Sequence, residues 1–232
     1  MAQSALDECL TDLFGGGCLA RVTRTESGSE ESHLRAAELS VIARAVPKRR
    51  REFSAGRKLA QDLLAELGAV PRPLLPDSDR CPIWPRGFRG SISHCAELCA
   101  VVVSADEKVK SVGLDIEPST PLEARLVERI CRPGELAGLG AQQKCERAKL
   151  LFSIKEAVYK CQFPISRTFL GFHDVEVELQ EGLFHAVIHE QQAALMVGRE
   201  ISGRFALRGG HVLSAARLDQ ESESQSGSTL RP

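Results

Sequence analysis

Two long segments with the periodicity of an amphipathic helix limit the folds open to this chain. The first is residues 48–68, KRRREFSAGRKLAQDLLAELG, which ends on glycine, a common helix stop. The second is residues 143–163, QKCERAKLLFSIKEAVYKCQF. The apolar positions that share one stripe are Phe53, Leu59, Ala60, Leu63, Leu64 and Leu67 in the first segment and Leu150, Leu151, Ile154, Ala157, Val158 and Cys161 in the second.

Short β-branched runs lie between these helices and after them. LCAVVVS and VKSVGLDIE, on either side of ADEK, have the pattern of a hairpin. Residues 174–190 alternate between apolar and polar positions and predict another hairpin, and residues 203–218 predict two closing strands. Shorter helices are expected at 33–46 and 120–131, while the proline-rich residues 69–90 must form a loop.

This order of elements predicts an α+β protein of two similar halves. We place the N-terminal half at residues 1–108 and the C-terminal half at 109–218. Residues 219–232, DQESESQSGSTLRP, form a polar tail with almost nothing to bury, and we expect it to be disordered.

Composition and charge indicate in which cellular compartment the protein works and which classes of partner it does not bind. A formal net charge of −1 gives no general attraction to nucleic acid or to an anionic membrane. The amino terminus starts with acidic rather than basic residues, and no apolar run approaches the ~20 residues of a membrane span. Eight cysteines without a CxxC pair favour separate thiols in a reducing cytosol over a zinc site, although His94, Cys95 and Cys99 lie close in sequence.

Two carboxylates stand out inside an apolar run. Asp115 and Glu117 in VGLDIEP are two positions apart, so an extended chain would point both to one face, where two unneutralised anions would repel. Glu156 and Lys160 share a face of the second long helix, with Ser153 beside them. Three carboxylates at one point form the hard-oxygen site that Mg²⁺ prefers. A solvated strand end and a surface ion pair are the alternatives.

A basic segment and a polar tetrapeptide could serve an anionic ligand. The first half of the 48–68 segment carries Arg49, Arg50, Arg51, Arg57 and Lys58, and SISH supplies Ser93 and His94. Arginine is suited to phosphate, but a solvated helix face and a structural histidine are the plain alternatives. No GxSxG, GxGxxG or Walker A sequence is present, so a polyphosphate would have to be held in another way.

Together these residues resemble a known family. RRREFSAGR, CPIWP, GSISHC, VGLDIEP and FSIKEAVYK, in this order and at these separations, are similar to the 4'-phosphopantetheinyl transferases of the surfactin and enterobactin synthetase-activating type. The resemblance runs from about residue 47 to 218. It implies two pseudo-symmetric α+β halves with coenzyme A in the cleft between them, and transfer of phosphopantetheine to a carrier-protein serine with release of adenosine 3',5'-bisphosphate.

The resemblance also implies roles for single residues. Asp115, Glu117 and Glu156 match Mg²⁺ ligands, with Mn²⁺ as an alternative metal, and Glu156 matches the base for the carrier serine. Lys160 matches a lysine at the phosphates. The positions that match contacts to coenzyme A are Arg49, Arg57, Ser93 and His94 around the 3'-phosphate and adenine, and Leu170 near the pantetheine arm. Many relatives have Lys or Glu before the proline of CPIWP; this chain has Cys81 there, and we assign the contact to the preceding Arg80.

The expected partner is an apo acyl or peptidyl carrier protein, and a monomer would suffice because one chain contains both halves of the cleft. Which carrier is used, whether of fatty acid, polyketide or nonribosomal peptide synthesis, is a property of surface shape. Two other functions compete with transfer: a Mg²⁺-dependent nucleotide pyrophosphatase, in which water replaces the serine, and a non-catalytic module that binds carrier protein or coenzyme A. The second would be expected to have lost one of the three acids, and all three are present.

Overall fold

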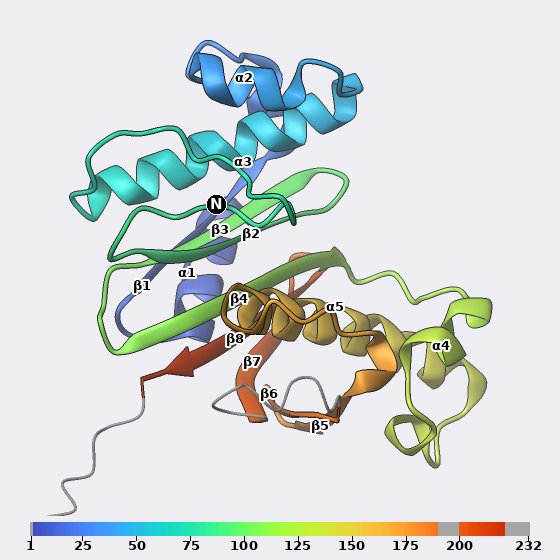
Figure 1. The fold of residues 1–232 in the computed structure, drawn as a ribbon. Helices are drawn as coiled ribbons and strands as arrows, with labels where there is room; N and C mark the ends of the chain where they lie inside the picture. Colours follow the sequence, from blue (N-terminus) through green and yellow to red (C-terminus); the bar gives the residue numbers. More distant parts are fainter. Residues whose placement is uncertain (1, 190–199, 221–232) are drawn as a thin grey trace, which may run out of the picture.

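The computed structural model describes residues 2–189 and 200–220 and contains two antiparallel sheets (Figure 1). The smaller sheet has the order β1-β3-β2, formed by β1 (Cys18–Arg24), β3 (Leu98–Ser104) and β2 (Arg89–His94). The larger has the order β4-β8-β7-β6-β5, formed by β4 (Val109–Pro118), β8 (His211–Asp219), β7 (Glu200–Arg208), β6 (Leu183–Ile188) and β5 (Val175–Gln180). The α+β class is confirmed.

Helices cover the sheets. The α-helices of the described chain are α1 (Ala2–Phe14), α2 (Ala36–Ile42), α3 (Pro47–Glu66), α4 (Ala124–Ile130) and α5 (Ala141–Ser166). Short 3₁₀ turns are η1 (Thr25–Ser29), η2 (Pro133–Leu136) and η3 (Phe172–Asp174). The long helix α3 packs on the smaller sheet and the long helix α5 on the larger one (Figure 1).

Both long helices lie where their periodicity predicts. Pro47 occupies the first turn of α3, where its missing amide hydrogen costs nothing. The predicted stripes are buried except that Leu67 and Leu150 are only partly covered. The hairpins β5–β6 and β7–β8 are also confirmed by their pairing.

The predicted hairpin between residues 98–104 and 109–117 is wrong. β3 lies between β1 and β2, whereas β4 pairs with β8 in the other sheet. Both strands are buried on both faces, since β3 packs on α3 and β4 packs on α5, while both also contribute to one hydrophobic cluster that includes α1. Such runs show no alternation that would report which neighbour they pair with.

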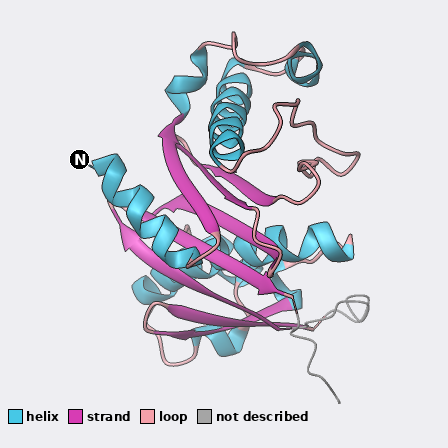
Figure 2. Ribbon diagram, turned by 90° about the vertical axis from the view of Figure 1, so that its left-hand side faces the viewer, coloured by secondary structure: helices cyan, strands magenta, loops and turns pink. Residues whose placement is uncertain are grey.

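Helix α1 and strand β1 were not predicted. Leu6, Leu10 and Phe14 are buried one turn apart, and Figure 2 shows the helix at the N-terminus lying across the strands. One hydrophobic cluster joins α1 and β1 to β3, β4 and β8, so it draws on both sides of the 108/109 boundary. The division into halves at this point stays a prediction.

The chain end and the cysteines complete the comparison. Strand β8 continues through Asp219, one residue beyond the predicted end, and residues 221–232 of the predicted tail lie outside the described residues. All eight cysteines are free thiols. Within residues 2–189 and 200–220, no helix is long and apolar enough to cross a membrane.

Candidate active site

The two sheets meet where β2 lies beside β4, and serine hydroxyls join them. The Leu114 amide donates to Ser91 Oγ at 3.1 Å, and the Ile116 amide donates to Ser93 Oγ at 3.4 Å. These amides lie on the edge of β4 that faces away from β8, so serine side chains replace a strand ladder there. The contact places the end of β2 next to the acids of β4.

Gly113 allows α5 to approach β4 closely enough to complete the site. A Cβ atom at this position would lie 1.9 Å from the Ala157 carbonyl oxygen and 2.6 Å from the Cys161 nitrogen. Only glycine therefore fits between strand and helix. The close contact brings the face of α5 that carries Glu156 and Lys160 against the acids of β4.

Asp115 is the centre of the site. It is 3% exposed, and its Oδ1 accepts hydrogen bonds from Ser93 Oγ at 2.8 Å and from Lys160 Nζ at 2.7 Å. Lys160 also donates to Ser93 Oγ at 3.0 Å. The other oxygen, Asp115 Oδ2, is buried and has no hydrogen-bond partner among the described residues. An orphaned buried carboxylate oxygen is costly unless a ligand completes it.

Glu117 and Glu156 complete the acidic group. Glu117 Oε2 accepts from Lys149 Nζ at 2.7 Å. Burial raises the pKa of the Glu156 carboxyl; Lys160 opposes the rise, while the negative charges of Asp115 and Glu117 add to it. The three carboxylates are therefore close enough to interact electrostatically. In the described part of the chain, however, no three acidic, histidine or cysteine side chains are arranged closely enough to hold a metal as they stand.

The donor set nevertheless fits a hard divalent cation. It consists of carboxylates, one of them with a buried oxygen that lacks a partner, and this is the ligand chemistry that Mg²⁺ takes in proteins. Lysines now hold Asp115 and Glu117, and they would have to yield to a cation. His94, Cys95 and Cys99, which lie close in sequence, do not form a metal-ligand cluster in the described residues.

A second group lies on α3 and the end of β2. Arg49 Nη1 donates to His94 Nε2 at 3.0 Å, which requires the imidazole to be neutral with its proton on Nδ1. Burial lowers the pKa of His94, Glu52 opposes this, and Arg49 and Lys160 lower it further. Glu52 lies 3.8 Å from Arg49 and 3.7 Å from His94.

Arg57 is buried beside this group. It is 6% exposed, its Nε donates to the Leu74 carbonyl at 2.7 Å, and its guanidinium stacks 4.3 Å from the Phe53 ring centroid. Burial lowers the pKa of Arg57 to about 10, with Glu38 opposing and Arg49 adding to the shift. Arg49, Arg57 and His94 therefore lie near one another, whereas the Ser93 hydroxyl, which the resemblance groups with them, donates to Asp115.

Two small pockets lie on either side of Tyr159, which lines both. One, of about 200 Å³, is also lined by Arg80, Ser91 and Lys160. The other, of about 160 Å³, is also lined by Glu156 and Leu170. Arg80 and Leu170 are thus each brought next to one of the charged residues of α5. Ser153, predicted to lie beside Glu156 and Lys160, is buried and bonded to Ser214 Oγ at 2.9 Å, and Ser214 is the partner of Asp115 in the pairing of β4 with β8.

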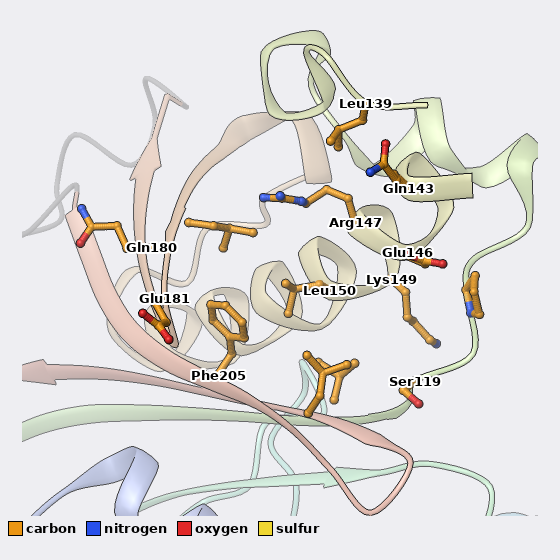
Figure 3. A pocket seen from close by; sticks show the side chains of 14 residues that line it. Ser119, Leu139, Gln143, Glu146, Arg147, Lys149, Leu150, Gln180, Glu181 and Phe205 are labelled. Atoms are coloured by element: carbon orange, nitrogen blue, oxygen red, sulfur yellow. The ribbon is translucent and has the colours of Figure 1, made fainter. Parts of the chain in front are cut away.

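A pocket of about 800 Å³ lies at the amino-terminal half of α5, between this helix and the ends of the larger sheet (Figure 3). Its wall includes Leu139, Leu150 and Phe205, with Arg147 and Lys149 among its charged residues. None of the predicted site residues lines it. Lys149 connects the pocket to the acids through Glu117, and sequence patterns missed both Lys149 and Tyr159 because neither belongs to an obvious charge pair.

Family models match most of the chain. Residues 37–104 match the 4'-phosphopantetheinyl transferase N-terminal domain, and residues 111–215 match the 4'-phosphopantetheinyl transferase superfamily. The second range contains the three acids and Lys160, and the first contains the Arg49, Arg57 and His94 group.

Individual proteins are similar over much of their length. The chain is 37% identical to 4'-phosphopantetheinyl transferase PptT of Mycobacterium tuberculosis over 62% of this chain and 64% of that protein. It is 36% identical to 4'-phosphopantetheinyl transferase Svp of Streptomyces mobaraensis, over 72% and 68%. It is 34% identical to enterobactin synthase component D of Salmonella typhi, over 72% and 71%. The chain thus spans just under two thirds of the mycobacterial protein and slightly more of the other two.

Proposed function

This chain belongs to the 4'-phosphopantetheinyl transferase superfamily, a family of transferases, and we propose that it transfers the 4'-phosphopantetheine group of coenzyme A to a serine of an apo carrier protein. The single observation that carries this proposal is the environment of Asp115. A buried carboxylate with an orphaned oxygen lies beside a second acid of its own strand and faces Glu156 and Lys160 of α5. That arrangement suits the pyrophosphate of coenzyme A with a bound cation.

The reaction joins the serine oxygen to the phosphorus that bears pantetheine and breaks the pyrophosphate bond, so adenosine 3',5'-bisphosphate leaves. Asp115, Glu117 and Glu156 would hold Mg²⁺ or Mn²⁺, which neutralises charge across the pyrophosphate when bound. Glu156 takes the serine proton, directly or through water. Lys160 supplies positive charge to the phosphates.

The other end of the donor would lie against α3. Arg49 of α3 carries guanidinium donors and lies against His94 at the end of β2, and Arg57 adds a buried positive charge beside them. These groups suit the 3'-phosphate and adenine of coenzyme A. Arg80 and Leu170 line the pockets beside Lys160 and Glu156, which suits contacts near the phosphates and the pantetheine arm.

The partner we propose is an apo acyl or peptidyl carrier protein, met by a monomeric enzyme in the cytoplasm. The test is to incubate the chain with coenzyme A, Mg²⁺ and an apo carrier protein and to measure the intact mass of the carrier. We expect a mass increase of one phosphopantetheine group. Cleavage of coenzyme A with the carrier unmodified would support the pyrophosphatase instead, and binding without cleavage would support the non-catalytic module.

A further inference from the structure

Lys149 holds the second acid of the site and has no part in the proposed reaction. Its Nζ lies 2.7 Å from Glu117 Oε2, and the two side chains are 12% and 22% exposed. An ion pair covered to this degree is screened by salt less than a surface pair. Glu117 therefore has a counterion of its own before any cation arrives.

The spacing along α5 explains how two lysines reach one pair of acids. Lys149, Glu156 and Lys160 are seven and four residues apart, so they lie on the same face of the helix. The two lysines are roughly 16 Å apart along the helix axis, whereas Asp115 and Glu117 are about 7 Å apart along the strand. The lysine side chains thus converge on the acids from both ends, with Glu156 between them.

The Lys149 ammonium group also has a second contact within its reach. Its Nζ lies 5.6 Å from the Phe152 ring centroid, within the range of a cation–π contact. Figure 3 shows its side chain extending toward Ser119, just after β4, while Arg147 points to the other side of the pocket. The ammonium group could therefore leave Glu117 and remain in contact with an aromatic ring and solvent.

We propose that Lys149 competes with the divalent cation for Glu117. It is a positioning residue: it keeps the Glu117 carboxylate neutralised at the site until the cation displaces it, and so it sets the concentration of cation at which the site fills. This inference rests on the proposed function, because it requires the cation to bind at the acids of β4.

The test measures metal binding without turnover. Mn²⁺ is titrated into the full chain, and free Mn²⁺ is followed by its electron paramagnetic resonance signal. Lys149→Gln should lower the Kd for Mn²⁺ by about fivefold, the upper end for an ion pair that keeps some exposure. Lys149→Arg should stay within about twofold of wild type because the charge survives. The matched control is Lys144→Gln, on the same helix, whose ammonium group makes no ion pair with a described residue; it should change nothing.

A double-mutant cycle shows whether Lys149 acts through Glu117. In the Glu117→Gln background, Lys149→Gln should have no further effect on the Kd. An unchanged or weakened affinity in Lys149→Gln alone, or an equal gain in both backgrounds, overturns the inference. If Asp115→Asn and Glu117→Gln leave the Mn²⁺ affinity of the wild type intact, the metal site itself is wrong and the inference fails with it. Loss of Mn²⁺ in those two variants with no effect of Lys149→Gln overturns the Lys149 role alone.

Discussion

The two carboxylate oxygens of Asp115 have opposite environments. Its Oδ1 accepts hydrogen bonds from Ser93 and Lys160, while its Oδ2 is buried and has no hydrogen-bond partner among the described residues. Stability alone would favour a fully satisfied or apolar group here. The free-energy cost of burying this oxygen is explained if a ligand binds to it during the reaction.

At the residue scale, Arg49 and His94 provide a test of how the donor is held. Arg49→Ala and His94→Ala should each raise the KM for coenzyme A by roughly 10- to 100-fold, because charge-assisted hydrogen bonds to the 3'-phosphate would be lost. With dephospho-coenzyme A the same substitutions should have little effect. Steady-state kinetics with the two donors measures the difference.

Arg51→Ala is the matched control, since this arginine lies on the same exposed stretch of α3 but, unlike Arg49, makes no hydrogen bond or ion pair with His94 or any other side chain of the described residues. It should leave both KM values unchanged. Equal losses with both donors in Arg49→Ala and His94→Ala would show that these residues do not contact the 3'-phosphate. Arg57 is a less clean probe, because its bond to the Leu74 carbonyl and its packing on Phe53 make it part of the fold.

At the element scale, the site depends on how closely α5 packs on β4. Gly113→Ala should lower the free energy of unfolding by about 3 kcal/mol, because the added methyl group would collide with helix backbone that cannot move aside cheaply. Chemical denaturation measures this. Gly134→Ala is the control, since a Cβ there meets nothing within 4 Å and it should change stability by less than about 0.5 kcal/mol. Equal effects would refute the close contact.

The opposite face of α5 is anchored by a buried ion pair. Lys155 and Glu135 have side chains that are 1% and 2% exposed, and Lys155 also donates to the carbonyls of Ile130 and Phe172. Lys155→Met should lower the free energy of unfolding by about 3–5 kcal/mol because Glu135 would be left charged and buried. Lys144→Met should cost far less. A small loss in Lys155→Met, measured by denaturation, would contradict this role.

The elements were predicted from sequence to the extent that their own periodicity defined them. Helices α3 and α5 and the hairpins β5–β6 and β7–β8 follow from local patterns. The partner of β4 does not, because a strand buried on both faces has no alternation to read. The acids and Lys160 stand out by their spacing in the sequence, and the motif resemblance assigns their roles. The ion pairs of Asp115 and Glu117 could not be predicted, because they depend on long lysine side chains that cross between elements.

For the whole molecule, the joint between the sheets is the functional feature. The smaller sheet supplies the end of β2 and the larger sheet supplies the acids of β4. Helix α1 reinforces the joint, since Arg217 of β8 donates to the Phe14 carbonyl at 3.0 Å and Asp7 of α1 accepts from the Val22 amide of β1 at 2.6 Å. The site is therefore built from both sheets and held by a helix that the sequence pattern did not indicate.

The most direct test of the central claim is the single-turnover rate of phosphopantetheine transfer at saturating coenzyme A and Mg²⁺ in Glu156→Gln. The amide neither carries the charge nor accepts the serine proton, so the rate should fall by roughly 100-fold or more, and added Mg²⁺ should not restore it. Glu146→Gln, an exposed acid on the same helix, should keep the wild-type rate. A folded Glu156→Gln protein that transfers at the wild-type rate would contradict the account.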